Sequence, residues 1–476
     1  MAGRAGSCQR GHVDRQTALD RATESFDSGA FRTVLARRVA HRTESADPRR
    51  AEELRGYLTG EMVPAVERLG FTARVVENPV SPGHPFLVAH RSEGSPRRVL
   101  TYGHGDVQPA HPSQWRAGLD PWRLVVEGDR WYGRGVADNK GQHTVNLEAL
   151  DAVIAARGGR LGYDVTLLLD MGEESGSPGL TELCAQQRAD LAADLLIGSD
   201  GPRVAADRPT VFLGTRGSMN LTFRVAAREG AHHSGNWGGV LVNPATVLAN
   251  ALASIVDGRG RLLVDGLRPP PVPEPVRAAL ASIDVDQGPD SPTLDPEWGE
   301  PGLTPGERLW AWNTLEVLAM TAGDPDAPVN AIPPSARAHC QLRFVVGTDA
   351  ARVPELLRAH LDSAGFAAVQ VEVEHTMDAT RLDPEDPWVT WTLASIERST
   401  GTTPALLPNL GGSLPNEPFA AVLGLPTVWV PHSYPGCAQH APDEHLPTGL
   451  VRESLQLMAG LWWDLGEPDA PWRARS

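Results

Sequence analysis

Several short motifs place residues that can bind a metal directly after apolar, strand-like runs. His104 and Asp106 follow the run RRVLTY, and Asp200 follows ADLLIGS. Glu173 and Glu174 stand side by side after VTLLLDMG, although two adjacent carboxylates repel one another unless a positive charge lies near them. In open α/β sheets, ligands bind beyond the carboxyl ends of the strands. These motifs therefore predict one site where several strand ends converge.

Two further motifs supply residues of the same types. Asp138 lies in the glycine-rich stretch GRGVADNKG, and His440 lies in QHAPDEH near the C-terminus. One acidic strand end alone indicates only a solvated turn, but four in succession, joined by two histidines, indicate a metal centre. The mixture of imidazole and carboxylate suits zinc, with manganese and cobalt as alternatives. His445 lies close to His440 and is a competing ligand by residue type.

The elements that must position these residues alternate between strands and helices. The apolar runs at 97–104, 163–171, 193–200 and 425–430 are typical of strands. Residues 142–159 are typical of a helix that ends at a Gly-Gly pair. Residues 124–135 predict a hairpin, and 51–71 have helical spacing. This alternation predicts an α/β fold with a mainly parallel sheet covered on both faces. The first seventy or so residues are typical of helices, although we expect the first thirty of them to be a poorly ordered extension.

The pattern changes between residues 215 and 379. Half-exposed strands are expected near 218–227, 336–346 and 367–376, and helices at 243–257 and 351–365. The Pro-rich passage that begins at 267 predicts an irregular region up to about residue 334. These elements favour an α+β module with helices on one side of a sheet. The predicted organisation is a catalytic domain formed by 1–214 and 380–476, interrupted by an inserted domain at 215–379.

The composition narrows the class of protein. The net charge of −16 argues against a nucleic-acid surface, which needs clustered basic residues, and no segment has the apolar length of a membrane span. The N-terminus is polar and has no apolar signal core. The cysteines form no C-x-x-C pair and favour a reducing cytoplasm over a disulfide framework. They are Cys8, Cys184, Cys340 and Cys437.

The ordered series GHGDV, GRGVADNKG, MGEES, SDG and QHAPDEH resembles the M20 metallopeptidase family, which includes carnosinase-like dipeptidases and aminoacylase-type deacylases. The likeness runs in order and spacing over nearly the whole chain from about residue 51, and includes the inserted domain. It implies a catalytic domain that holds two Zn²⁺ ions. It also implies that the inserted domain is a ferredoxin-like lid through which two subunits form a homodimer.

The resemblance implies a role for each residue of the metal set. His104 and Asp200 would hold one zinc ion, and Glu174 and His440 would hold the other. Asp138 would bridge both ions, because a carboxylate has two oxygens and can span metals about 3.5–4 Å apart. The two ions would also remove the repulsion between the adjacent glutamates.

Two more residues of these motifs are expected to act beside the ligands. Asp106 would accept the second N–H of His104 and so fix the tautomer of the imidazole. Glu173 would be the general base that takes a proton from a metal-bridging water and delivers it to the leaving nitrogen.

The inserted domain carries a second set that the resemblance assigns to the substrate. His233 in AHHSG matches a histidine that reaches the active site of the neighbouring subunit, and the histidine before it is the alternative. Asn330 and Arg343 stand at matching positions, and the planar guanidinium of Arg343 would clamp a substrate carboxylate. Gly412 and Ser413, in the loop GGS, would direct backbone N–H groups at the same carboxylate.

These features lead to one interpretation with two rivals. The first is a di-zinc metallohydrolase that cleaves the amide bond of a dipeptide or another small aminoacyl amide. An aspartate at position 200 is typical of family members that accept a free α-amine. The second is a deacylase of an N-acyl or conjugated amino acid, and the third is a non-catalytic scaffold. We therefore expect a cytoplasmic homodimer with a small peptide or amide substrate and no nucleic-acid or membrane partner.

Overall fold

The computed structural model describes residues 14–285 and 292–472, which form two compact units. The first unit contains the residues up to Val211, the segment Asp386–Pro404 and the residues from Ala421 onward. The second unit contains Phe212–Glu385 and Ala405–Ala420. The second unit is therefore an insertion that takes one additional short segment from the C-terminal part of the chain.

A mixed sheet forms the centre of the first unit, with strands in the order β1-β2-β6-β3-β7-β16. The last four of these are parallel neighbours, whereas β1 and β2 are antiparallel at one edge. Strands β3 and β7 are buried almost continuously, so both of their faces are covered. The prediction of a mainly parallel sheet is confirmed. The strands are β1 (Thr72–Val76), β2 (Phe86–Arg91), β3 (Arg98–His104), β6 (Asp164–Asp170), β7 (Leu195–Gly198) and β16 (Thr427–Trp429).

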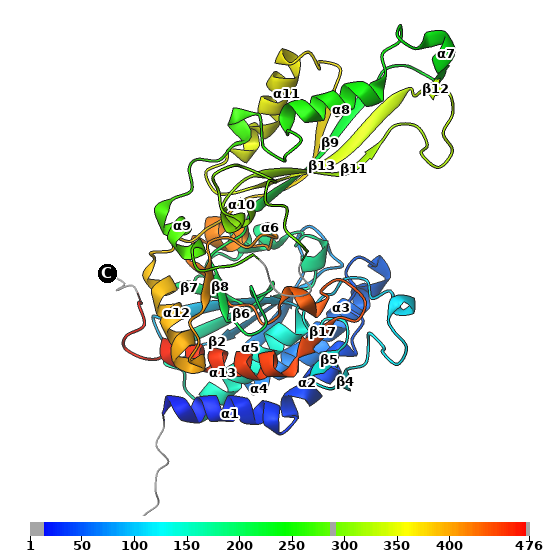
Figure 1. Cartoon of the computed structure of the whole chain (residues 1–476). Helices are drawn as coiled ribbons and strands as arrows, with labels where there is room; N and C mark the ends of the chain where they lie inside the picture. The colour runs from blue at the N-terminus through cyan, green and yellow to red at the C-terminus, as the bar shows by residue number, and fades with distance from the viewer. Residues whose placement is uncertain (1–13, 286–291, 473–476) are drawn as a thin grey trace, which may run out of the picture. The chain divides into compact units, whose positions relative to one another are not determined.

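Helices α1 (Arg15–Asp27), α5 (Lys140–Ala156) and α13 (Thr448–Leu465) pack against one another (Figure 1). The expectation of a poorly ordered extension is wrong for α1, because this helix buries Leu19 and its Arg15 donates to Asp464 of α13 at 2.8 Å. Only contacts with a distant part of the chain reveal this order. Residues 1–13 lie outside the described residues.

Shorter elements complete the first unit. A small sheet joins β17, β5 and β4, of which β4 and β5 form the hairpin predicted at 124–135. The helical spacing at 51–71 corresponds to α3 and α4, joined by a π-helical turn. The bounds are α2 (Ala30–Val39), α3 (Ala51–Tyr57), α4 (Val63–Arg68), β4 (Val125–Glu127), β5 (Arg130–Tyr132), α6 (Leu180–Gln186), α12 (Pro387–Thr400) and β17 (His445–Pro447).

The second unit is built on an antiparallel sheet with the order β11-β13-β9-β14. Alternate residues of β9 and β13 point into a core that includes residues of α8 and α11, so these helices cover one face, as expected for an α+β module. Helix α8 begins after Asn243, whose side chain accepts a hydrogen bond from Ala245 N at 3.0 Å. The bounds are β9 (Gly217–Ala226), α8 (Pro244–Ile255), β11 (Thr314–Thr321), β13 (Ser335–Phe344), α11 (Val353–Ser363) and β14 (Gln370–Met377).

Strand β11 corrects the expectation of an irregular region up to residue 334. A bulge between Val317 and Ala319 shifts the register of β11 against β13, which interrupts the two-residue alternation that would have revealed a strand. The same region contains α9 and α10. The remaining elements are β8 (Thr210–Phe212), where the chain passes between the units, and β10 (His232–His233), α7 (Ser234–Trp237), α9 (Glu274–Leu280), α10 (Pro305–Trp310), β12 (Ala331–Ile332) and β15 (Ala405–Leu407).

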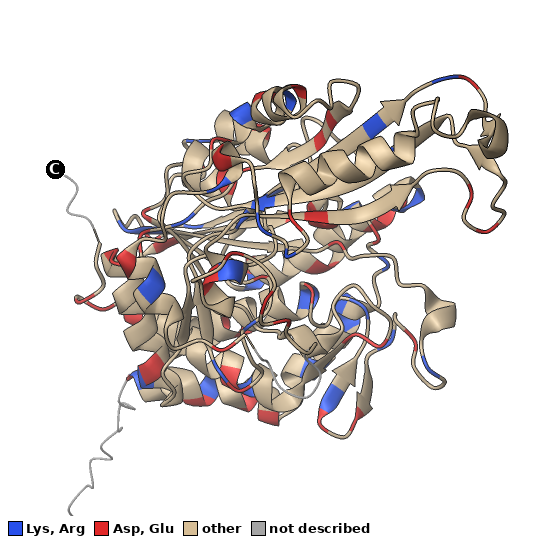
Figure 2. Cartoon of the chain, turned by 45° about the horizontal axis from the view of Figure 1, so that its top comes forward, with Lys and Arg blue, Asp and Glu red and all other residues tan. Residues whose placement is uncertain are grey.

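The charged side chains and the helices bear on binding to nucleic acids and membranes. Acidic and basic side chains are interspersed over the elements of both units (Figure 2). Within 14–285 and 292–472, every helix is too short or too polar to span a bilayer.

Candidate metal centre

Two overlapping groups of metal-binding side chains lie in the first unit, beyond the carboxyl ends of its parallel strands. His104, Asp138 and Asp200 form one group, and Asp138, Glu174 and His440 form the other. Within each group the ligand atoms lie within 4.8 Å of one another. The structure therefore brings together all five residues that the sequence suggested as ligands.

Asp138 is the residue that the two groups share. Its Oδ1 lies 3.0 Å from His104 Nε2, and its Oδ2 lies 3.0 Å from His440 Nε2. The second distances in each group are 3.6 Å from His104 Nε2 to Asp200 Oδ2 and 3.2 Å from His440 Nε2 to Glu174 Oε2. Each oxygen of Asp138 thus faces a different histidine, which is the arrangement that a bridging carboxylate needs.

Unpaired oxygen atoms in the same place indicate that these groups fit cations. Among the described residues, Glu174 Oε1 and Asp200 Oδ2 are buried without a hydrogen-bond partner. A buried carboxylate oxygen without a partner is costly, and a bound divalent cation supplies the missing interaction. The donor set of two imidazoles and three carboxylates suits Zn²⁺ and related ions.

The titration behaviour of the cluster has the same physical origin. Burial raises the pKa of Glu174 to about 7, with the charge of Asp138 acting in the same direction. Burial also raises the pKa of Asp200 and raises the pKa of Glu173 well above its ordinary value. In contrast, hydrogen bonds to Asp138 and Glu174 raise the pKa of His440 to about 11. So many buried acids are stable as anions only when positive charge compensates them.

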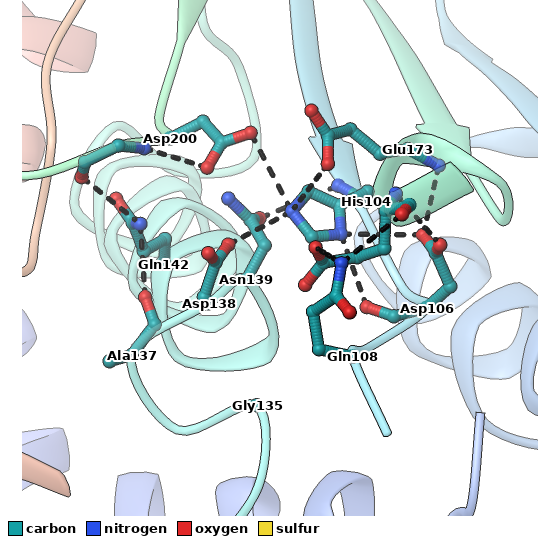
Figure 3. A network of polar contacts seen from close by, with 12 residues as sticks. His104, Asp106, Gln108, Gly135, Ala137, Asp138, Asn139, Gln142, Glu173 and Asp200 are labelled. Atoms are coloured by element: carbon teal, nitrogen blue, oxygen red, sulfur yellow. Dashed lines mark hydrogen bonds and ion pairs between the residues drawn. The ribbon is translucent and has the colours of Figure 1, made fainter. Parts of the chain in front are cut away.

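Asp106 connects the histidine of one group to the adjacent glutamates. His104 Nδ1 donates to the Asp106 carbonyl at 3.1 Å and lies 3.3 Å from Asp106 Oδ1 (Figure 3). The proton is therefore held on Nδ1, which leaves the lone pair of Nε2 available to a metal ion. The Asp106 carboxylate also accepts from the backbone N–H groups of Glu173 and Glu174 at 3.2 and 3.1 Å. Asp106 thus fixes the orientation of the His104 ring and the backbone of the Glu173–Glu174 turn.

Glu173 has a different position from Glu174, although the two are neighbours in the chain. Both lie in the short 3₁₀ turn Glu173–Ser175 that follows β6. Glu173 Oε2 lies 3.9 Å from His104 Nε2, but Glu173 belongs to neither group of ligands. The structure therefore places one carboxylate of the pair beside the candidate metal centre without making it one of the ligands.

The sequence analysis missed Glu444, which organises the loop that carries Asp138. Its buried carboxylate accepts hydrogen bonds from Arg134 Nη1 at 2.7 Å and from three backbone N–H groups of the same loop. These donors are Gly135 at 2.9 Å, Ala137 at 2.8 Å and Asp138 at 3.1 Å. Glu444 lies inside the motif QHAPDEH, which could have drawn attention to it. Its role, however, depends on a contact across 306 positions of the chain.

Gln108 is a second residue that the sequence did not indicate. Its amide Nε2 donates to Glu174 Oε2 at 3.0 Å and to the Glu174 carbonyl at 3.2 Å. These bonds hold the glutamate that belongs to the group with His440. Gln108 therefore orients the carboxylate of Glu174 by hydrogen bonds, as Asp106 orients the imidazole of His104.

His445, the competing ligand, lies outside both groups. Its Nδ1 donates to the Asp443 carbonyl at 3.0 Å, and its ring centroid lies 5.2 Å from that of Tyr132. The geometry thus distinguishes His440 from His445, which residue type alone could not do.

The second unit contains the residues that were expected to bind the substrate. His233 pairs with Ala331 between the short strands β10 and β12. The backbone N–H and the hydroxyl of Ser234 donate to the carbonyl of Asn330 at 2.9 and 3.1 Å. His233 and Asn330 therefore belong to one local structure, although almost a hundred residues separate them.

Arg343 and the loop that contains Gly412 and Ser413 also come together in this unit. Arg343 Nη1 donates to Ser413 Oγ at 2.7 Å. Arg216, which the sequence analysis did not identify, donates from Nε and Nη2 to the Gly411 carbonyl at 3.1 and 3.0 Å. Burial, assisted by the positive charge of Arg343, lowers the pKa of Arg216 to about 10. Two guanidinium groups thus surround this loop, which favours an anionic ligand there.

Comparison with known proteins decides the family. The model of peptidase family M20/M25/M40 matches residues 100–464, a span that includes every residue of both metal-binding groups. The chain belongs to this family. It is therefore an M20-type metallopeptidase, and its use of a divalent metal follows from that membership.

Several relatives resemble the enzyme over most of its length. A cysteinylglycine-S-conjugate dipeptidase of Corynebacterium striatum is 29% identical over 398 residues, covering 80% of this chain and 83% of the relative. A human Beta-Ala-His dipeptidase is 25% identical over 389 residues, covering 78% and 75%. Among solved structures, the dipeptidase Dug1p of Saccharomyces cerevisiae has a TM-score of 0.77 at 22% identity and covers 95% of this chain and 100% of its own. That likeness shows the shared fold.

Proposed function

We propose that the enzyme is a di-zinc dipeptidase. One zinc ion would be held by His104, Asp138 and Asp200, and the other by Asp138, Glu174 and His440. The observation that carries this proposal is the shared carboxylate of Asp138, each oxygen of which lies 3.0 Å from a different histidine. A dinuclear site needs such a bridge, and the two buried carboxylate oxygens beside it that have no hydrogen-bond partner support the same conclusion.

Within this proposal, Glu173 is the general base. The bound cations would polarise the scissile carbonyl and lower the pKa of the attacking water. Glu173 takes the proton from that water and delivers it to the leaving nitrogen, because its carboxylate lies beside the ligands without being one of them. Asp106 assists by holding the tautomer of His104 and the backbone of the glutamate turn.

A dipeptide is the substrate that the charges support best. The negative surroundings of the metal centre favour a cationic α-amine at one end of the substrate. Arg343, with Ser413 and Gly412, would hold a carboxylate at the other end, and His233 and Asn330 would contribute further contacts. Two relatives with high coverage of this chain are also dipeptidases by name.

Hydrolysis of matched blocked and unblocked substrates tests the reaction class. The zinc-loaded protein is incubated with a series of dipeptides and with their N-acetyl derivatives, and the products are measured by mass spectrometry. We expect faster cleavage of the free dipeptides, because acetylation removes the cationic amine. Faster cleavage of the acetylated compounds would replace this proposal with the deacylase alternative.

A homodimer through the second unit forms part of the proposal. Strand β11 lies at the edge of its sheet, and the exposed fractions of its Leu318 and Met320 are 62% and 45%. Unprotected apolar edge strands are rare in monomers because they pair with other chains. The exposed Val240 and Val329 extend the apolar surface of this unit. These features support a contact with a second copy, and such a contact would allow His233 to serve the partner.

A further inference from the structure

The sheet of the second unit has a polar cavity that the proposed reaction does not use. Strands β9 and β13 alternate, so that the residues between those of the hydrophobic core point to the opposite face of the sheet. The cavity has a volume of about 450 Å³ and shares no residue with the metal centre or with the proposed substrate contacts. It is lined by Thr222, Arg224, Thr321–Gly323, Ser335–Arg337, His339, Glu372 and Glu374.

One side of this cavity carries two arginines in an unfavourable arrangement. Arg224 of β9 and Arg337 of β13 are direct partners in the antiparallel register. Like charges directly opposite each other on a sheet destabilise it unless an anion lies between them. Within the described parts of the chain, neither guanidinium has a carboxylate within 4 Å. The pair is therefore suited to receive a carboxylate from outside through paired N–H donors.

The other side of the cavity carries acids and an ordered hydrogen-bond network. The Thr222 hydroxyl donates to Glu374, and His339 Nδ1 lies 2.8 Å from the same hydroxyl oxygen. Because the hydroxyl proton is directed to Glu374, the oxygen accepts the Nδ1 proton of His339. Thr222 is only 5% exposed and lies at the floor of the cavity, whereas the side chains of His339 and Glu374 are 40% and 50% exposed. Glu372 stands opposite Thr222 in the register and adds a second negative charge.

We propose that this cavity binds a free α-amino acid. The carboxylate of the ligand pairs with Arg224 and Arg337, and its ammonium group pairs with Glu372 and Glu374. A simple anion would pair only with the arginines, and a simple amine would pair only with the glutamates. The register makes Arg224 and Glu372 diagonal neighbours on adjacent strands, so side chains of opposite charge reach the same cavity. If the enzyme is a dipeptidase, as proposed above, the ligand is a product of its own reaction.

Equilibrium dialysis with isotopically labelled L-alanine tests the site without hydrolysis. The full-length protein is used free of metal and with Arg343→Ala, so that the proposed catalytic site contributes no binding. We expect saturable binding of one L-alanine per chain. Arg337→Gln or Arg224→Gln should weaken it about tenfold or more, because each removes a charge-assisted contact. Arg352→Gln, a change of an exposed arginine in the same unit that lies outside the cavity, should leave it unchanged.

Competition separates the zwitterion from simpler ligands. Propionate lacks the amine of L-alanine and ethylamine lacks its carboxylate, so each should compete at least about tenfold less well than unlabelled L-alanine. Equal competition by propionate would overturn the proposal in favour of a plain anion site. Absence of saturable binding, or an equal loss in the Arg352→Gln control, would overturn it entirely. Because metal and turnover are not involved, these outcomes are independent of whether the enzyme cleaves dipeptides.

Discussion

At the scale of single residues, the adjacent Glu173 and Glu174 occupy different environments within one turn. Asp106 accepts the backbone N–H groups of both, so the turn has a fixed shape. Within that shape, Glu174 Oε2 lies 3.2 Å from His440 Nε2, whereas Glu173 remains outside both groups of ligands. The two carboxylates therefore differ in environment although they are neighbours in sequence.

This difference gives a prediction for the two isosteric variants. Glu173→Gln should keep its metal and lose turnover by about 10²-fold or more, because only a proton acceptor is removed. Glu174→Gln should lose metal affinity as well as turnover, because a ligand oxygen is replaced. Metal content by mass spectrometry and the turnover number of each purified variant check the prediction. Equal loss of metal in both variants would contradict the assignment.

Glu444 is predicted to control metal binding without touching the metal. Glu444→Gln replaces an acceptor oxygen by an NH₂ group, which cannot accept the N–H donors that Asp138 and its loop present. We expect zinc affinity to fall about 10- to 100-fold, measured by competition with a chelator. The matched control is Glu61→Gln, because Glu61 is also buried against arginines but lies outside the groups of ligands. An equal loss of affinity in the control would indicate a general effect on folding.

At the scale of elements, β13 and the loop after β15 define the proposed site for a carboxylate. Arg343 near the end of β13 donates to Ser413, and Arg216 donates to Gly411 from a position just before β9. The guanidinium groups of Arg343 and Arg216, which repel one another, thus both bind this loop.

A substitution in this element should affect substrates according to their charge. Arg343→Ala is expected to raise KM for a dipeptide about ten- to a hundredfold, because a hydrogen bond to a charged group contributes about 1.5–3 kcal/mol. The KM for the same dipeptide with an amidated C-terminus should change much less. Steady-state kinetics with the two compounds measure the difference, and Arg352→Ala provides the control. A similar increase for both compounds would show that Arg343 does not recognise the carboxylate.

At the scale of the whole molecule, the question is whether one chain contains a complete active site. His233 belongs to the second unit, and its neighbourhood includes the exposed Trp237, Val240 and Val329. If a second copy covers this surface, His233 is available to the metal centre of that copy. Activity would then depend on assembly as well as on metal.

Mixing two inactive variants tests this dependence. Glu173→Gln and His233→Ala are each expected to be nearly inactive, but a hybrid dimer contains one site with both intact residues. Random exchange of subunits should restore about a quarter of the wild-type activity, because half of the dimers are hybrids with one intact site of two. Activity of the mixture and its molar mass by light scattering are measured together. A fully active monomer would exclude the proposal.

Much of the fold followed from local sequence patterns. The continuous apolar runs predicted β3, β6 and β7, because a strand that is covered on both faces of the sheet has apolar side chains on both faces. Helix α8 was visible from its apolar spacing and from Asn243 at its start. In contrast, β11 was missed because its bulge interrupts the alternation. The order of α1 was not predicted, although helices were expected in this region, because it depends on distant contacts such as that between Arg15 and Asp464.

The sequence by itself determined which residues could hold a metal, because each candidate ligand follows a strand or lies in a short motif with it. Only the tertiary structure decided which of these residues meet. It brings His440, and not His445, next to Asp138, and it places Glu444 under the same loop across 306 positions of the chain. The physical reason is that residue type and spacing act over one or two turns, whereas a metal centre is assembled by the packing of elements that are far apart in sequence.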